Sequence, residues 1–357
     1  MHRSTPLGHI LVTGGAGFIG CALSQLLASS ATSWTVVDNL HPQVHPSGER
    51  PAALAPEAAL VIADVSDEDT FARLGDLRPD IVIHLAAETG TGQSLHEASR
   101  HSLANVVGTT RLTDWLSATG HNPGHILLTS SRAVYGEGQW RERSGRVFYP
   151  GQRSHAMMSA CQWDFPDAVG LPASAAETQP MPTSVYGATK LAQEHVLSAW
   201  TLSHGVPLSI FRLQNVYGPG QSLTNPYTGI VTLFSRLAKA GTSIPVYEDG
   251  EIIRDFVFID DVAAALVAGL RAVPDGVRTL DVGTGMPTSI TKLAATMADH
   301  HQAPSPHVTG QFRDGDVRHA LADVSATRKE LGWQSLVDIH EGVARLQEWI
   351  DAQENVS

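Results

Sequence analysis

Cysteine is scarce in this sequence, since Cys21 and Cys161 are the only two among 357 residues. Two cysteines cannot build a disulfide framework, so we expect a protein of a reducing compartment. Cys161 belongs to no C-x-x-C pair, and the 17 histidines show no H-E-x-x-H spacing. The sequence therefore predicts no metal site.

Basic residues are also in short supply, with 24 Lys and Arg against 36 Asp and Glu and a formal charge of −12. This balance argues against a nucleic-acid or anionic membrane partner. No apolar run approaches the ~20 residues of a membrane helix. The first expected strand begins at Ile10, with no signal-like segment before it. We expect a cytoplasmic protein with one large α/β domain and a smaller partner domain.

Glycine, in contrast, is concentrated in residues 10–20, ILVTGGAGFIG, where an apolar strand meets a helix-like segment. The spacing fits G-x-G-x-x-G from Gly15 and G-x-x-G-x-x-G from Gly14. Such glycines permit a positive φ, backbone approach to a pyrophosphate and close packing of the helix, whose N-terminus attracts phosphate. The residues predicted to bind a dinucleotide here are Gly14, Gly17, Phe18, Ile19 and Gly20.

A carboxylate follows at the end of the second expected strand, residues 34–37, as Asp38. It lies about 20 residues beyond the glycines, where an acid binds a ribose 2′-hydroxyl. Asp38 would repel a 2′-phosphate, and no arginine follows it at residues 39–41. NAD is therefore favoured over NADP as the cofactor. The alternative to dinucleotide binding is a glycine turn in an unrelated α/β protein.

Apolar segments alternate with helix-like segments along the first 215 residues. Strands are expected at 59–63, 80–85, 125–128 and 207–213, and helices at 67–74, 95–118 and 185–203. This alternation predicts an α/β fold with a doubly wound parallel sheet, whose ligands lie at the carboxyl ends of the strands. Residues 137–182 break the pattern and form an expected insertion, either a specificity lid or surface decoration.

Tyr186 and Lys190 form a Y-x-x-x-K pair that shares one face of the expected helix 185–203. A nearby ammonium lowers the pKa of a phenol and makes it a usable base. Ser131, at the end of a strand, can hydrogen-bond the same substrate oxygen. These three residues predict proton removal from an alcohol during hydride transfer, the alternative being an exposed i,i+4 pair on an ordinary helix.

The motifs together resemble those of extended short-chain dehydrogenases/reductases, in the NAD-dependent nucleotide-sugar epimerase/dehydratase family. The matching segments are TGGAGFIG (13–20), VVDN (36–39), HLAA (84–87), SSRAVYGEG (130–138), YGATK (186–190), FRLQNVYGPGQ (211–221), EDGEIIRDFVFIDDV (248–262), VGTG (282–285) and GDVRHALAD (315–323). The resemblance implies a Rossmann domain for NAD at 1–215 and a smaller C-terminal α/β substrate domain at 216–357, with 256–285 returning to the first. It also implies a homodimer joined by helices 95–118 and 185–203.

The resemblance assigns further site residues. The additional cofactor contacts that it implies are Asn39, Asp64, Val65, Leu85, Ala86, Ala87, Asn105 and Ser130, in addition to Tyr186 and Lys190. Asn105 is expected to steady the strand that ends in Ser131. The implied substrate contacts are Ser131, Asn215, Arg254, Arg313 and Arg318, with Gln93 and Ser94 either at the sugar or in a loop that leads into a helix. Arg254 alternatively pairs with Asp255 or Asp260.

Arg132 and Ala133 follow Ser131, where related dehydratases carry an Asp-Glu pair that expels water. Neither residue is a carboxylic acid or base, so the sequence favours 4-epimerisation of a dTDP- or UDP-sugar. The alternatives are a 4,6-dehydratase, a decarboxylase, a 4-ketoreductase or a non-catalytic NAD sensor. AAETGTGQS (86–94), NPYTG (225–229) and the insertion most resemble dTDP-L-rhamnose 4-epimerases.

Overall fold

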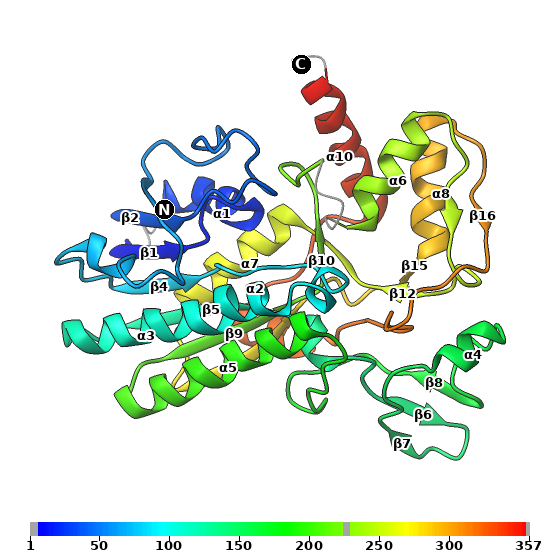
Figure 1. The fold of residues 1–357 in the computed structure, drawn as a ribbon, viewed down its shortest axis with the longest axis horizontal. Coiled ribbons are helices and arrows are strands. Elements are labelled where there is room, and N and C mark those ends of the chain that lie inside the picture. Colours follow the sequence, from blue (N-terminus) through cyan, green and yellow to red (C-terminus); the bar gives the residue numbers. More distant parts are fainter. Residues whose placement is uncertain (1–5, 224–228, 355–357) are drawn as a thin grey trace.

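The structure is a computed structural model that describes residues 6–223 and 229–354, so most of the NPYTG segment lies outside the described residues. Its centre is a seven-stranded parallel sheet in the order β14-β9-β5-β4-β1-β2-β3 (Figure 1). The strands are β1 His9–Thr13, β2 Ser33–Asp38, β3 Ala59–Ile62, β4 Ile81–His84, β5 His125–Ser131, β9 Leu208–Leu213 and β14 Val277–Val282. This confirms the predicted Rossmann-type sheet. The order reverses between β1 and β4, where such sheets bind ligands.

Side chains alternate between the two faces of the sheet, and both faces are covered. Ile10 and Val12 of β1 pack in the core cluster beneath α1 (Phe18–Leu27) and α7 (Ile259–Arg271), whereas Leu11 packs in the cluster beneath the other helices. Those helices are α3 (Gly108–Thr119) and α5 (Val185–His204). Burial on both faces explains why the central strands β1 and β4 contain short continuous apolar runs.

Two expected helices differ from the prediction. The helix predicted at 67–74 is only a 3₁₀ turn, Phe71–Leu74, because Ser66 gives its N–H and hydroxyl to Asp64 instead of capping a helix. The helix predicted at 95–118 begins with a 3₁₀ turn and contains a π-helical turn. Its parts are Gln93–Leu95, α2 Ala98–Ser102, the π turn Leu103–Val107 and α3.

The insertion folds into a small unit of its own. It comprises β6 Trp140–Glu142, β7 Val147–Phe148, α4 His155–Ser159 and β8 Ala168–Gly170, with an antiparallel sheet in the order β7-β6-β8. The Trp140 ring packs edge-on against Phe165 with ring centroids 4.9 Å apart. In Figure 1 the unit projects beneath β12 and β15 of the C-terminal part.

After β9 the chain leaves the large sheet and builds a separate core. The elements there are β10 Asn215–Tyr217, α6 Ile230–Lys239, β11 Pro245–Val246, β12 Ile253–Arg254, β13 Phe256–Phe258, β15 Thr288–Ser289, α8 Ile290–His301, β16 His307–Val308 and α10 Ile339–Glu354. Helix α9, Ser325–Leu331, packs instead against β14 and α7 at the large sheet. β13 pairs with β10 outside the large sheet. β14 extends the large sheet next to β9.

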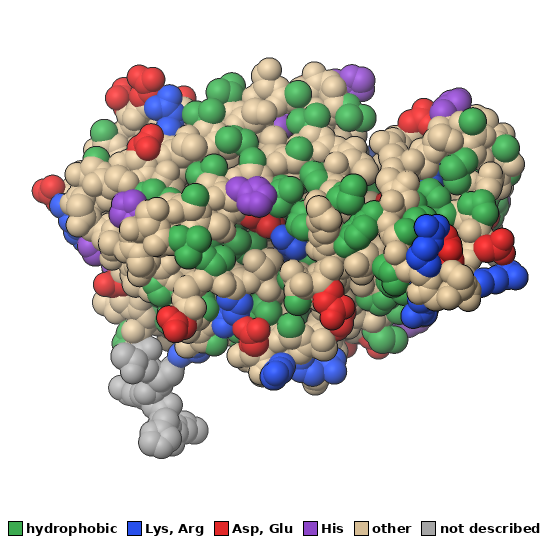
Figure 2. All heavy atoms as spheres, turned by 90° about the horizontal axis from the view of Figure 1, so that it is seen from below, with side chains coloured by type: hydrophobic (Ala, Val, Ile, Leu, Met, Phe, Trp, Pro, Cys, Tyr) green, Lys and Arg blue, Asp and Glu red, His purple; other side chains and the backbone are tan. Residues whose placement is uncertain are grey.

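The surface carries mixed charge. On the face shown in Figure 2, Lys and Arg side chains lie in small groups interspersed with Asp and Glu. Among the described residues, no helix has the length and apolar character that crossing a bilayer requires.

Candidate active site

The glycine turn between β1 and α1 is packed too closely for larger residues. Gly14 has φ +70°, and a Cβ there would lie 2.5 Å from the Ala86 nitrogen. A Cβ on Gly20 would lie 2.4 Å from the Gly15 carbonyl oxygen. Gly17 precedes α1 and provides no side-chain cap, which leaves the first N–H groups of the helix for a ligand. This cradle fits a dinucleotide pyrophosphate.

Asp38 ties the end of β2 to the glycine turn. Its Oδ2 accepts a hydrogen bond from the Ala16 N–H at 3.0 Å, and its Oδ1 accepts one from the Leu40 N–H at 2.9 Å. Each carboxylate oxygen retains another lone pair. The carboxylate is therefore fixed in place and can still accept the hydroxyl groups of a ribose.

Asp64 and Val65 follow β3 beside this point. Asp64 accepts hydrogen bonds from Asn39 Nδ2 and the Ser66 N–H, both at 2.8 Å. Partial burial opposes the ionised form, but the bonds from Ser66 and Asn39 hold the pKa of Asp64 below its usual value. Val65 lies against Gly108, where an added Cβ would come within 2.6 Å of a Val65 methyl.

The segment after β4 lies against the glycine turn and is fixed by Asn105. The Leu85 N–H donates to the Thr13 carbonyl at 2.9 Å. Asn105 accepts from the Glu88 N–H at 2.8 Å and donates to the Glu88 carbonyl at 3.0 Å and to Thr189 Oγ1 at 2.9 Å. These contacts correct the expectation that Asn105 steadies the strand of Ser131. The π turn places Asn105 between residues 86–88 and α5 instead.

Ser131 and Tyr186 meet where β5 ends and α5 begins. The Ser131 hydroxyl interacts with the phenol of Tyr186, and it also accepts from the Ala133 N–H at 3.2 Å. Burial raises the pKa of Tyr186 above its usual value, while the Ser131 hydrogen bond and the charge of Arg132 act in the opposite direction. The phenol is thus buried, oriented and close to a cation.

Lys190 lies one turn after Tyr186 and is buried. Burial lowers the pKa of Lys190 to about 7, although the nearby Glu194 carboxylate raises it. Its ammonium donates to the Gln193 side-chain oxygen. Gln193 in turn donates to Thr109 Oγ1 at 2.9 Å. The ammonium therefore lies at the end of a series of hydrogen-bonded polar side chains, Gln193 and Thr109.

His84, at the end of β4, belongs to the same series of hydrogen-bonded side chains. Its ring nitrogens lie 2.6 Å from Thr13 Oγ1 and 2.8 Å from Thr109 Oγ1. Burial, followed by the charge of Lys190, lowers the pKa of His84 to about 3, so the ring is neutral. Sequence reasoning assigned no role to His84 or Gln193. The spacing of Gln193 from Lys190, three residues along the helix, was the available signal.

Ser130 belongs to a second buried network. Its hydroxyl donates to Glu194, which also accepts from Arg212 Nε at 3.0 Å and Nη2 at 2.7 Å. The Arg212 guanidinium lies over the Tyr135 ring, whose hydroxyl donates to Asp281 at 2.8 Å. The network joins β5, α5, β9 and β14 directly behind Ser131.

Gln93 and Ser94 hold the start of α5. Ser94 Oγ accepts from the Tyr186 N–H at 3.0 Å and donates to the Thr91 carbonyl at 2.7 Å. Gln93 exchanges hydrogen bonds with Gln43 and donates to Glu97. Both side chains are buried. These contacts favour the alternative that Gln93 and Ser94 belong to a loop that leads into a helix, because neither side chain is free to bind a sugar.

Arg254 pairs with neither Asp255 nor Asp260, so that alternative is wrong. Its Nη2 donates to Asp316 Oδ1 at 2.7 Å. Asp255 instead accepts from residues 284 and 285, and Asp260 pairs with Arg345. Arg254 is nearly buried and pairs with a carboxylate on the next segment of the C-terminal part.

Two further side chains have hydrogen-bonding groups that no described residue satisfies. Arg132 has no hydrogen-bond or ion-pair partner within residues 6–223 and 229–354, and burial together with the charge of Arg254 lowers its pKa to about 10. Asn215 Oδ1 is buried and, in the same described residues, accepts no hydrogen bond. A donor without a partner and an acceptor without a partner are what a polar substrate requires.

Arg313 and Arg318 differ sharply in their surroundings. Arg313 is exposed, with its guanidinium over the Tyr247 ring at 5.2 Å. Arg318 is buried and donates to Asp164 and Asp249, each at 2.7 Å, and to Glu248 at 3.2 Å. Three carboxylates therefore engage the Arg318 guanidinium, a feature that sequence spacing did not predict.

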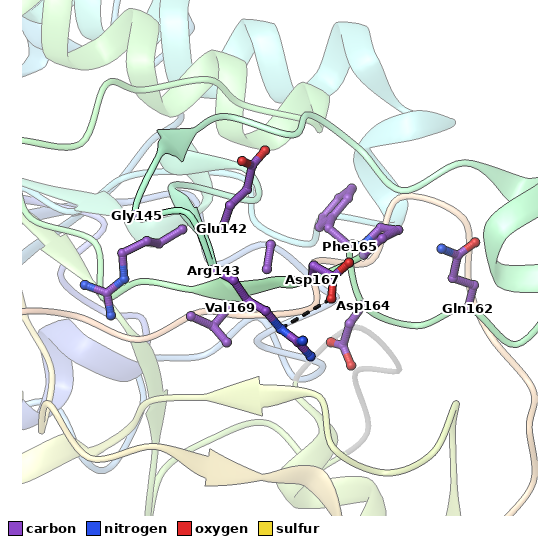
Figure 3. Close-up of a pocket in the computed structure, with 11 residues that line it drawn as sticks. Glu142, Arg143, Gly145, Gln162, Asp164, Phe165, Asp167 and Val169 are labelled. Carbon is purple, nitrogen blue, oxygen red and sulfur yellow. Dashed lines mark ion pairs between the residues drawn. The ribbon is translucent and has the colours of Figure 1, made fainter.

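The insertion contains a pocket of about 660 Å³ that is separate from Ser131, Tyr186 and Lys190. Figure 3 shows it lined by side chains of the insertion alone, with Arg143 directed toward Asp167 at 3.3 Å. None of the residues around Ser131 lines it. It is therefore not the candidate active site. The described part of the chain contains no group of three or more side chains placed to ligate a metal.

Comparisons with known proteins agree with this geometry. The sequence profile of the NAD dependent epimerase/dehydratase family matches residues 10–283. A dTDP-L-rhamnose 4-epimerase from Burkholderia thailandensis is 60% identical over 346 residues, which cover 97% of this chain and 95% of the relative. A Thermotoga maritima UDP-glucose 4-epimerase with UDP-glucose has a TM-score of 0.80 at 28% identity, covering 97% and 99% of the two chains. A Thermus thermophilus UDP-glucose 4-epimerase complex with NAD has the same fold, with a TM-score of 0.75 at 24% identity and coverage of 96% and 99%.

Proposed function

Because the chain belongs to the NAD-dependent epimerase/dehydratase family, we propose that it inverts carbon 4 of a nucleotide sugar, with dTDP-L-rhamnose as the substrate. The proposal rests on the 60% identity, across nearly the whole of both chains, to a dTDP-L-rhamnose 4-epimerase. Inversion of C4 in that sugar gives dTDP-6-deoxy-L-talose. Nothing is lost or added in this reaction, so tightly held NAD can serve repeated cycles.

The cofactor would be held by the glycine turn at 14–20, by Asp38 on the adenosine ribose and by Lys190 on the nicotinamide ribose. The free N–H groups at the start of α1 and the two fixed Asp38 oxygens support this assignment. When bound, NAD supplies a hydride acceptor that later becomes the donor. The positive nicotinamide ring also adds to the charge that favours ionisation of Tyr186.

Tyr186 is the proposed acid and base. Its phenolate accepts the proton of the C4 hydroxyl as the C4–H bond breaks. After the 4-keto sugar has rotated in the site to present its opposite face, the phenol returns the proton. The Ser131 hydroxyl donates to the same sugar oxygen and stabilises its developing charge. The ammonium of Lys190, buried one turn from Tyr186, stabilises the phenolate.

Elimination of water is disfavoured by the residues near Ser131. Arg132 and Ala133 provide no carboxylate, and the closest buried acid along the chain is Glu137. Burial raises the pKa of Glu137 to about 7, and its carboxyl group accepts the N–H groups of residues 318 and 319. That carboxyl group is committed to the backbone, which supports an epimerase over a 4,6-dehydratase or decarboxylase.

We also propose a division of labour within the chain. Residues 1–215 bind NAD, and residues 216–357 bind the nucleotide sugar, except that 256–285 return to the NAD-binding part. The return of β14 to the large sheet supports this division. Asn215, the last residue of the NAD-binding part, and Arg254, in the C-terminal part, then face the substrate diphosphate, since a guanidinium suits a phosphate dianion.

A cytoplasmic homodimer is proposed as the working form. Helices α3 and α5 lie side by side on one face of the sheet (Figure 1). Leu103 and Leu202, on this helix layer, are 52% and 69% exposed. Exposed apolar side chains on paired helices suit a four-helix bundle with a second copy. Leu202→Glu should shift the mass in light scattering from dimer to monomer, whereas Leu336→Glu, in the loop between α9 and α10, should not.

The function is tested by incubating the purified protein with dTDP-L-rhamnose, dTDP-glucose and UDP-glucose in deuterated water and recording NMR spectra. Inversion at C4 without ring deuterium is the expected result. A 4-keto-6-deoxy product from dTDP-glucose, with deuterium at C5 or C6, would instead indicate a dehydratase. Tyr186→Phe should lower kcat by about 10²–10⁴-fold while NAD remains bound. Binding without turnover in the wild-type protein would point to a sensor.

A further inference from the structure

Arg153, in the insertion between β7 and α4, has a side chain with no exposed surface. Its Nη1 donates to Glu248 Oε2 and its Nη2 to Glu248 Oε1, each at 2.8 Å. Glu248 belongs to the C-terminal part, between β11 and β12. The two charges therefore form a bidentate ion pair that joins the insertion to the segment leading to Arg254. Such pairs are weak evidence for stability alone, because both charges lose their hydration.

The same guanidinium reaches the residue that orients Arg254. Arg153 Nη2 donates to the Asp316 carbonyl oxygen at 2.9 Å. The Asp316 carboxylate accepts from Arg254 Nη2 at 2.7 Å. One residue thus receives Arg153 on its main chain and Arg254 on its side chain. A shift of the Asp316 backbone would therefore change the direction of the Arg254 guanidinium.

Arg318 reinforces this connection. It binds Asp164 of the insertion at 2.7 Å and Glu248 at 3.2 Å, so Glu248 receives both buried arginines. Glu137 accepts the N–H groups of residues 318 and 319. The insertion, residues 247–250 and residues 316–319 are consequently one charge network. Asp164 also borders the pocket of Figure 3.

We infer that Arg153 is a positioning residue for the substrate diphosphate: through Asp316 it sets the direction of Arg254 and makes the insertion a working part of the nucleotide-sugar site. The inference rests on the proposed function, in which Arg254 binds a phosphate. Guanidinium–phosphate recognition depends on directed hydrogen bonds. Misdirecting Arg254 therefore weakens substrate binding and leaves the chemistry at C4 intact.

The test compares Arg153→Met/Glu248→Met with the wild-type holoenzyme. Replacing both partners avoids leaving a buried Glu248 without Arg153, which would by itself destabilise the fold. The probe is dTDP, measured by isothermal titration calorimetry, followed by KM and kcat for dTDP-L-rhamnose. We expect the affinity for dTDP to fall about 10-fold and KM for dTDP-L-rhamnose to rise by the same factor. The values of kcat, NAD content and Tm should stay near those of the wild type.

Two further variants keep the test decisive if the double variant fails to fold. Arg153→Lys retains a charge for Glu248 but lacks the fork that reaches Glu248 and Asp316 together, so it should also weaken dTDP binding. Arg143→Met is the matched control within the same insertion. Its side chain is 87% exposed and, among the described residues, forms an ion pair with Asp167 alone, so dTDP affinity should not change.

Arg254→Met separates this inference from the proposed function. If Arg254→Met weakens dTDP binding and the Arg153 variants do not, the positioning role is wrong while the site assignment stands. If Arg254→Met leaves dTDP affinity unchanged, both the phosphate assignment and the positioning role fail. A parallel loss of Tm, NAD content and kcat in Arg153→Lys would indicate a merely structural role and overturn the inference.

Discussion

Gly17 and Gly20 lie in the same turn, yet the structure gives an added methyl group very different surroundings at the two positions. A Cβ on Gly20 would lie 2.4 Å from the Gly15 carbonyl oxygen and 2.5 Å from the Gly15 carbonyl carbon. A Cβ on Gly17 would meet only the Gly14 carbonyl oxygen, at 3.4 Å. Gly20→Ala should therefore push α1 away from the turn, whereas Gly17→Ala should fit the fold.

The expected magnitudes follow from these distances. Overpacking typically costs about 1–3 kcal/mol, and the obstructing atoms at Gly20 are backbone, so we expect about 3 kcal/mol. Gly17 has φ −71°, which alanine adopts without strain. Alanine lowers the conformational entropy of the unfolded chain, which stabilises the folded state by about 0.4–1 kcal/mol. Alanine is also a weaker N-cap than glycine, which costs about 0.5–1 kcal/mol. The two effects roughly cancel.

Urea unfolding and NAD titration check this prediction together. Gly20→Ala should lower the free energy of unfolding and lose NAD. Gly17→Ala should unfold at the wild-type urea concentration but bind NAD more weakly, because its methyl group stands where phosphate approaches the helix N-terminus. Equal unfolding midpoints for the two variants, or wild-type NAD affinity in Gly17→Ala, would refute the assigned roles.

Three other predictions address the buried charges. Arg132→Met removes a cation beside Tyr186 and should raise the pKa of that phenol, which moves the rising limb of the kcat–pH profile to higher pH; an unmoved limb would contradict this. Arg212→Met leaves Glu194 without its buried partner and should lower the free energy of unfolding by about 3–5 kcal/mol in urea, while Arg212→Met/Glu194→Met should recover most of the loss. Burial raises the pKa of Asp281 from its ordinary 3.8 to about 7, so the folded state binds this proton more tightly and stability should fall as pH rises through that interval. Asp281→Asn should flatten the corresponding decline in Tm, and an unchanged slope would exclude Asp281 as its source.

Much of the fold could be predicted because its signals are local. The apolar run of β1, the glycines and α1 are contiguous, and the buried residues of α1 (Gly20, Cys21, Leu23, Ser24 and Leu27) recur at helical spacing. Tyr186 and Lys190 are one turn apart on α5, which begins at an N-cap, Ser184, that accepts from the Gly187 N–H. These features depend on neighbours within a few residues.

Other features were predicted wrongly or not at all. The expected helix at 67–74 failed because the Asp64 carboxylate competes for the N–H and hydroxyl of Ser66. The role of Asn105 was misplaced because a π turn rotates its side chain toward the segment after β4. The insertion showed no regular periodicity because its strands are two or three residues long.

The sequence by itself determined the parallel sheet, the glycine turn, the acid that follows β2 and the placement of Tyr186 and Lys190 one turn apart on the same helix. Only the tertiary structure decided which partner each buried charge takes. Arg153 and Glu248 are 95 residues apart, and Arg318 and Asp164 are 154 apart. Periodicity and capping act over one or two turns of chain, whereas these ion pairs form only after separate units pack together and exclude water from the charges.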